Sequence, residues 1–126
     1  MIFDLNDITA KIEAFASGND NVAAAYLFGS AATGRMRRHS DVDIAIMSKV
    51  DVDGFEKAAM ETALSNLIGR DVDIVIFHQA DALMQHQILK YGQMLYEKDR
   101  DERIRQETFA RRRYLDTRFL YRKLAA

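Results

Sequence analysis

The sequence of 126 residues contains no cysteine and no proline. Without cysteine the chain can form no disulfide, no thiolate nucleophile and no cysteine-ligated zinc site. Without proline its helices can run with no forced break. No apolar run approaches the ~20 residues that a membrane-spanning helix needs, and the first residues lack the basic and apolar segments of a signal peptide. We therefore expect a cytoplasmic protein that makes no contact with membranes.

The net charge is also small, but the positive and negative residues are distributed unevenly along the chain. The formal net charge is −1, with 48% hydrophobic and 29% charged residues, which is ordinary for a globular protein and gives no reason to expect direct nucleic-acid binding. Residues 1–99 carry a net charge of −6, whereas residues 100–126 carry +5. The length predicts one domain over residues 1–126, with an acidic body and a basic C-terminal segment.

Short apolar runs alternate with helical patterns along the chain. Helical spacing of apolar residues predicts helices over residues 7–17, 55–68, 81–90 and 100–123, the first with Asp7 as its N-cap. The runs that read as strands are residues 22–28, 41–47, 71–77 and 93–97. This order predicts an α/β fold: a small mixed β-sheet flanked by helices, with a long C-terminal helix.

Acidic residues interrupt two of these predicted strands. Asp41 and Asp43 share one face of their strand because side chains alternate with a period of two, and Asp73 lies between Val72 and Ile74. Carboxylates in apolar strands are costly unless something compensates them. If the two strands are neighbours, the three acids form the all-oxygen site that Mg²⁺ accepts, completed by substrate phosphates.

Two of these assignments have alternatives. Asp41 alone reads equally as a turn residue at a strand entrance. Asp71 shares a face with Asp73 and is a second candidate for the third acid. We prefer Asp73 because apolar residues flank it on both sides.

A Gly-Ser pair precedes the acids. Gly29 and Ser30 directly follow the first predicted strand, where backbone N–H groups and a hydroxyl can bind phosphate, and where a glycine lets the backbone approach it closely. Taken alone, such a pair is an ordinary turn.

The combination of Gly29-Ser30, Asp41-Val42-Asp43 and a later Asp73 resembles the nucleotidyltransferase superfamily. The length and layout are similar to its minimal members, the small partners of HEPN-domain proteins, and the resemblance runs from the first strand to Tyr96. It implies a polymerase-β-like fold with Asp41, Asp43 and Asp73 as catalytic metal ligands. It also implies that Gly29 and Ser30 contact the nucleotide, that Mg²⁺ is the cofactor and that ATP is the donor.

The resemblance further implies a biological role. Minimal nucleotidyltransferases of this layout act as antitoxins that move AMP from ATP to a tyrosine of a HEPN ribonuclease toxin, so we expect a HEPN toxin as partner. Two alternatives remain open: nucleotidyl transfer to a small molecule such as an aminoglycoside, and a non-catalytic antitoxin that acts by binding alone.

Two basic segments lack an assigned role. Arg35, Arg37 and Arg38 lie beside the expected site and read either as a phosphate- or partner-binding cluster or as a solvated loop. Many relatives carry arginine where this chain has Thr33, and the cluster could replace that charge. Residues 100–124 combine basic with aromatic and aliphatic side chains, which predicts an amphipathic helix that packs on the domain, docks a partner, or does both.

Overall fold

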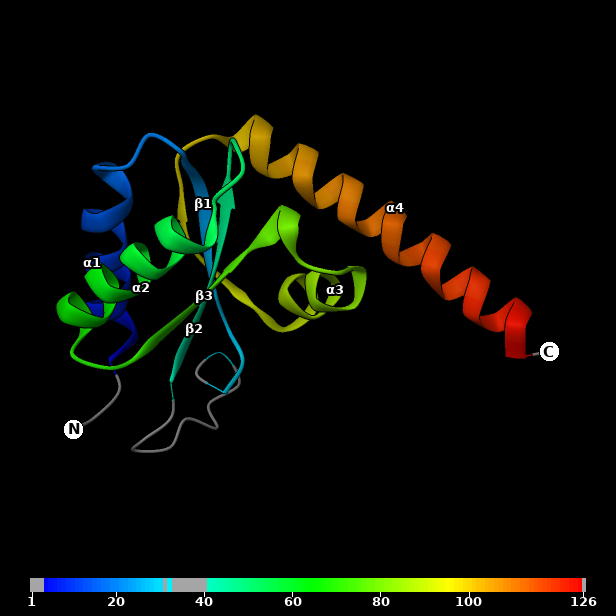
Figure 1. The fold of residues 1–126 in the computed structure, drawn as a ribbon, viewed down its shortest axis with the longest axis horizontal. Coiled ribbons are helices and arrows are strands. Elements are labelled where there is room, and N and C mark those ends of the chain that lie inside the picture. Colours follow the sequence, from blue (N-terminus) through cyan, green and yellow to red (C-terminus); the bar gives the residue numbers. More distant parts are fainter. Residues whose placement is uncertain (1–3, 31, 33–40, 126) are drawn as a thin grey trace.

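The computed structural model describes residues 4–30, 32 and 41–125. Its elements are, in order, α1 (Leu5–Ser17), β1 (Val22–Phe28), β2 (Val42–Ser48), α2 (Gly54–Ile68), β3 (Val72–Ile76), the 3₁₀ turn η1 (Phe77–Gln79), α3 (Ala82–Tyr91), β4 (Gln93–Glu97) and α4 (Arg100–Ala125) (Figure 1). The four strands form one sheet in the order β3-β2-β1-β4. β2 and β3 pair in parallel, whereas β1 pairs antiparallel with both β2 and β4, which confirms the predicted mixed sheet.

Helices cover both faces of this sheet (Figure 1). On one face, α1 and α2 bury Ile12 and Leu64 against alternate residues of the strands. On the other face, Ile88 of α3 and Ala110 of α4 pack with Phe77 and the small side chains of β1. Because both faces are covered, the central strands β1 and β2 are buried along nearly their whole length, as their continuous apolar runs predict.

Aspartates begin the first three helices. The side chain of Asp53 accepts a hydrogen bond from the Glu56 N–H at 2.7 Å, and Asp81 does the same for the Met84 N–H at 2.8 Å. The expectation that Asp7 caps α1 is wrong. The N-cap is Asp4, three residues earlier, whose side chain accepts hydrogen bonds from the backbone N–H groups of Asn6 and Asp7. Asp7 lies inside the helix and pairs with Lys11 at 2.7 Å.

The outer edge of β3 is closed by side chains of α2. Ser65 Oγ accepts from the Val72 N–H, and Glu61 Oε2 accepts from the Ile74 N–H, both at 2.9 Å. Lys57 Nζ donates to the Ile74 carbonyl at 3.3 Å. The backbone groups that an edge strand leaves open for another chain are therefore partly satisfied within this chain.

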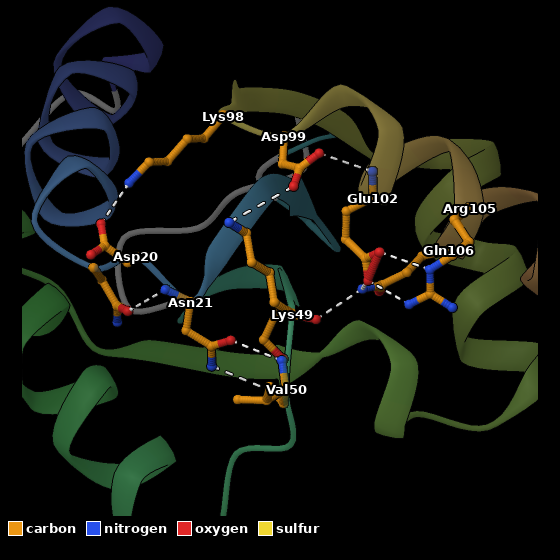
Figure 2. A network of polar contacts seen from close by, with 11 residues as sticks. Asp20, Asn21, Lys49, Val50, Lys98, Asp99, Glu102, Arg105 and Gln106 are labelled. Atoms are coloured by element: carbon orange, nitrogen blue, oxygen red, sulfur yellow. Dashed lines mark hydrogen bonds and ion pairs between the residues drawn. The ribbon is translucent and has the colours of Figure 1, made fainter.

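A polar network fastens the end of the sheet where β1 begins and β2 ends (Figure 2). Asn21 Oδ1 accepts from the Val50 N–H at 2.9 Å, and the Gln106 amide donates to the Ser48 carbonyl at 2.9 Å. Asp99 accepts from the Glu102 N–H at 3.1 Å, which caps α4. These contacts fix the first half of α4 against the end of β2.

None of the helices in the described part of the chain is long and apolar enough to cross a membrane.

Candidate functional site

The structure places Asp41, Asp43 and Asp73 at the end of the sheet where β2 and β3 begin, which is opposite the polar network of Figure 2. Asp43 is the register partner of Phe28, the last residue of β1, and of Asp73 on the parallel strand β3. Paired residues of adjacent strands lie about 4.8 Å apart at the backbone. Asp41 directly precedes β2. The two acidic strands are therefore neighbours, which is the condition for the three acids to form one site.

The register also separates Asp73 from Asp71. Asp73 lies beside Asp43, whereas Asp71 precedes β3 and its carbonyl accepts the Val42 N–H at 2.8 Å. Asp71 thus holds the entrances of the two strands together through its backbone. Of the two candidates, Asp73 is the one that the sheet aligns with Asp43.

Gly29 leaves room for the Asp43 carboxylate. Its φ is +72°, in the left-handed region that favours glycine, and an added Cβ would lie 2.3 Å from Asp43 Oδ2. Sequence reasoning assigned Gly29 to nucleotide contact and missed this packing role. The register pair of Phe28 and Asp43 is the signal that reveals it, because Gly29 is the next residue after that pair.

The three carboxylates influence one another. Burial raises the pKa of Asp43 above the ordinary aspartate value, and the negative charges of Asp73 and Asp41 raise it further. Asp41 and Asp73 are themselves exposed and Asp43 is half-buried. A cation placed at this end of the sheet would offset the repulsion and lower the pKa of Asp43.

The residues present fit a magnesium ion. They supply carboxylate oxygens from two adjacent strands, which is the donor chemistry that Mg²⁺ prefers, and the charges of Asp73 and Asp41 add to burial in raising the pKa of Asp43. Within residues 4–30, 32 and 41–125, no three acidic or histidine side chains are already close enough together to hold a metal ion. Metal binding by Asp41, Asp43 and Asp73 therefore stays a prediction.

Other predicted site residues divide into two groups. Ser30 lies in the turn after β1, next to Gly29, where the predicted nucleotide contact would require it. Thr33 and the cluster of Arg35, Arg37 and Arg38 lie outside the described residues.

The sequence model of one family, polymerase beta nucleotidyltransferase, matches residues 10–101. The chain belongs to this family. The match begins within α1 and ends at the start of α4, so it includes every strand of the sheet and all three acids of this nucleotidyltransferase domain.

A curated relative of this nucleotidyltransferase is the protein adenylyltransferase MntA of Shewanella oneidensis. The two are 29% identical over 79 residues, which is 63% of this chain and 57% of the relative. The matched part therefore spans little more than half of that protein's length.

Solved structures share the fold. A chain of a toxin–antitoxin complex with AMP-PNP aligns with a TM-score of 0.74 and 22% identity, covering 94% of this chain and 98% of that one. A complex of tri-AMPylated Shewanella oneidensis HEPN toxin with MNT antitoxin gives a TM-score of 0.67 and 19% identity, covering 94% and 97%. A chain described as a minimal nucleotidyltransferase gives 0.60 and 29% identity, covering 72% and 95%.

Proposed function

We propose that this chain is a protein adenylyltransferase that moves AMP from ATP to a tyrosine hydroxyl of a HEPN ribonuclease toxin, and so acts as an antitoxin in the cytoplasm. The observation that carries the proposal is the alignment of Asp43 with Asp73 beside Gly29, at the end of the sheet where β2 and β3 begin. The name of the matched relative and the AMPylated toxin in a structure of the same fold support this reading.

Each residue has a place in the reaction. Gly29 and Ser30 contact the triphosphate, with Gly29 keeping the Asp43 carboxylate free to turn toward it. Asp41 and Asp43, with Asp73, would hold Mg²⁺, which when bound neutralises the charge that builds on the phosphates. Asp73 orients the acceptor hydroxyl and takes its proton. The hydroxyl oxygen forms a bond to the α-phosphorus, the bond from that phosphorus to the bridging oxygen breaks, and pyrophosphate leaves.

The test compares wild type with the double variant Asp41→Asn/Asp43→Asn. Mg·ATP should raise the melting temperature of the wild type, since a ligand that binds only the folded state stabilises it, and the variant should lose most of that rise. Labelled AMP from ATP should appear on the HEPN protein with the wild type and not with the variant. Asp71→Asn, at the same strand entrance but outside the aligned pair, is the matched control and should behave as wild type.

The outcomes separate the alternatives. Transfer to an aminoglycoside and none to the HEPN protein would make the chain a small-molecule nucleotidyltransferase. Full neutralisation of the toxin by Asp41→Asn/Asp43→Asn would make it an antitoxin that acts by binding alone.

A further inference from the structure

The long C-terminal helix α4 continues past the body of the protein. It has 26 residues, a length of about 39 Å at 1.5 Å per residue, whereas the seven residues of β1 extend only about 23 Å. The N-terminal half of α4 lies along the sheet and α3, and the C-terminal end lies clear of the other elements (Figure 1).

Along one face of α4, burial against the rest of the protein decreases toward the C-terminus. Residues spaced by three or four along the helix share a face, and on the face that packs on the body Gln106 and Ala110 are buried, Tyr114 is half-buried, and Tyr121 and Leu124 are 70% and 83% exposed. Apolar residues thus continue on this face of α4 beyond the point where other elements of the protein pack against it. Exposed apolar surface of this kind, rimmed by charge, marks an interaction site.

A groove lies where this face leaves the body, between α3 and α4. Its volume is about 390 Å³. The imidazole of His86 stacks on the ring of Tyr114 with centroids 3.6 Å apart and an interplanar angle of 5°, forming one wall. Leu89 and Leu115 supply apolar surface, and Leu115 is 60% exposed.

The charged side chains that line the groove are basic, and one of them, Arg111, also pairs with Glu107 at 3.4 Å. Lys90, Arg111 and Arg118 line it, and among its described lining residues none is acidic. Residues 111–125 carry six lysines and arginines against the single acid Asp116. An occupant that buries the apolar floor and neutralises this rim must itself be apolar on one side and acidic around it.

We propose that this surface, the α3–α4 groove together with the exposed end of α4, docks an acidic amphipathic helix of the HEPN partner. The inference deepens the proposed function and rests on it. A groove between two helices accepts a third helix through apolar anchors three and four residues apart. None of Gly29, Asp43 and Asp73 lines the groove, so a partner bound there does not fill the nucleotide site.

Charge complementarity of this kind acts mainly on the association rate and weakens with salt. Exposed aliphatic side chains favour a protein occupant over RNA, because RNA binds through phosphate contacts and through stacking on aromatic or guanidinium planes. The combination of an apolar floor with a basic rim therefore favours a folded acidic helix.

The test is a titration of the unmodified, purified HEPN protein into three forms of this chain, at low and high salt. Arg111→Glu/Arg118→Glu reverses the rim and should weaken binding by about 30-fold or more at low salt. Arg100→Glu/Arg112→Glu changes charge equally on the same helix, at positions that neither line the groove nor lie at the exposed end of α4, and should change the dissociation constant by less than about threefold. Circular dichroism establishes that each variant is folded.

A second variant tests the apolar part. Leu115→Ser/Tyr121→Ser should weaken binding at both salt concentrations, because apolar contacts are not screened. Equal weakening by the rim variant and its control would overturn the docking site. Overturning also follows if the groove variants instead lose binding to single-stranded RNA or to anionic phosphatidylglycerol vesicles while HEPN affinity is unchanged.

Failure of this inference and failure of the proposed function are distinguishable. HEPN binding that depends on the groove, with no transfer of AMP by the wild type, supports the docking surface and removes the enzymatic role. AMP transfer by the wild type with HEPN affinity independent of the groove does the opposite. Absence of any HEPN binding by the wild type overturns both.

Discussion

The two ends of the β-sheet differ in how their charged side chains are paired. At the end where β2 finishes, Asn21, Lys49, Asp99 and Glu102 each have a partner of opposite charge or a backbone group at hydrogen-bonding distance (Figure 2). At the end where β2 begins, the described residues Asp41, Asp43 and Asp73 bring negative charges together, and the charges of Asp73 and Asp41 raise the pKa of Asp43. Satisfied polar groups stabilise a fold, whereas groups of one sign held together without compensation are typical of a site completed by a ligand.

The largest effect on activity is expected for Asp73→Asn, at the acidic end of the sheet. It keeps the size of the side chain but removes the negative charge and the ability to accept a proton, so transfer of AMP should fall by about 10³-fold. Because Asp41 and Asp43 remain, Mg·ATP should still raise the melting temperature. Steady-state transfer of labelled AMP and a thermal shift on the same sample check both parts. Loss of the thermal shift together with transfer would contradict this expectation and mean that Asp41 and Asp43 cannot hold Mg·ATP without Asp73.

The next effect is expected at Gly29. In Gly29→Ala the new Cβ meets Asp43 Oδ2 at 2.3 Å, and the positive φ adds strain of about 1 kcal/mol. The carboxylate is the part that can turn away, so transfer should drop by about 10²-fold while the protein stays folded. Gly69→Ala, also at a positive φ but with open space around it, is the matched control for strain alone. Equal activity of the two variants would contradict a role for the close approach.

Much of this site can be predicted from sequence, for a physical reason. Strand alternation places Asp41 and Asp43 together, and apolar neighbours identify Asp73 as an acid that needs compensation. The contact of Gly29 with Asp43 could not be predicted, because it depends on the register of β1 with β2. The long connection between these two strands does not fix that register as a tight hairpin turn would.

The fold shows the same division. The strand and helix positions follow local periodicity, and β1, α2 and β4 begin and end within a residue of the predicted limits. Three features depend on tertiary packing instead. The third strand ends at Ile76, one residue before its predicted end, and the chain turns into η1 at Phe77; side chains of α2 close the edge of β3; and the C-terminal part of α4 extends beyond the other elements.

The fastened end of the sheet can be weakened separately. Gln106→Met keeps side-chain length but removes the amide that donates to the Ser48 carbonyl and to Glu102 Oε1. The Gln106 Oε1 atom accepts no bond within the described residues, so the loss falls on the two donated bonds. The free energy of unfolding should decrease by about 2 kcal/mol, with Mg·ATP binding unchanged. Urea denaturation measures the first and calorimetric titration the second; altered nucleotide affinity would mean that the two ends are coupled.

The smallest expected effect is on stability, and it distinguishes the two ends of the sheet because the substitution should stabilise the protein instead of weakening it. Without metal or nucleotide, Asp43→Asn should make the protein more stable at neutral pH. The folded-state pKa of Asp43 is raised by burial and by Asp73 and Asp41. At a pH below the ordinary aspartate value, the carboxyl is protonated in both states and costs nothing. As pH rises toward the raised value, the folded protein keeps a proton that the unfolded chain releases, so stability falls with pH.

The melting temperatures of wild type and Asp43→Asn should therefore agree at about pH 3 and separate by about 2–5 °C in favour of the variant at about pH 7.5. Asp71→Asn, at the entrance of β3, should show no such separation. Mg·ATP should reverse the order of the two melting temperatures at neutral pH. It stabilises the wild type, whereas in the variant the metal would lose a carboxylate that helps to hold it. A variant less stable than wild type without ligand would mean that Asp43 already has a compensating partner within the chain, and this end of the sheet would then resemble the other.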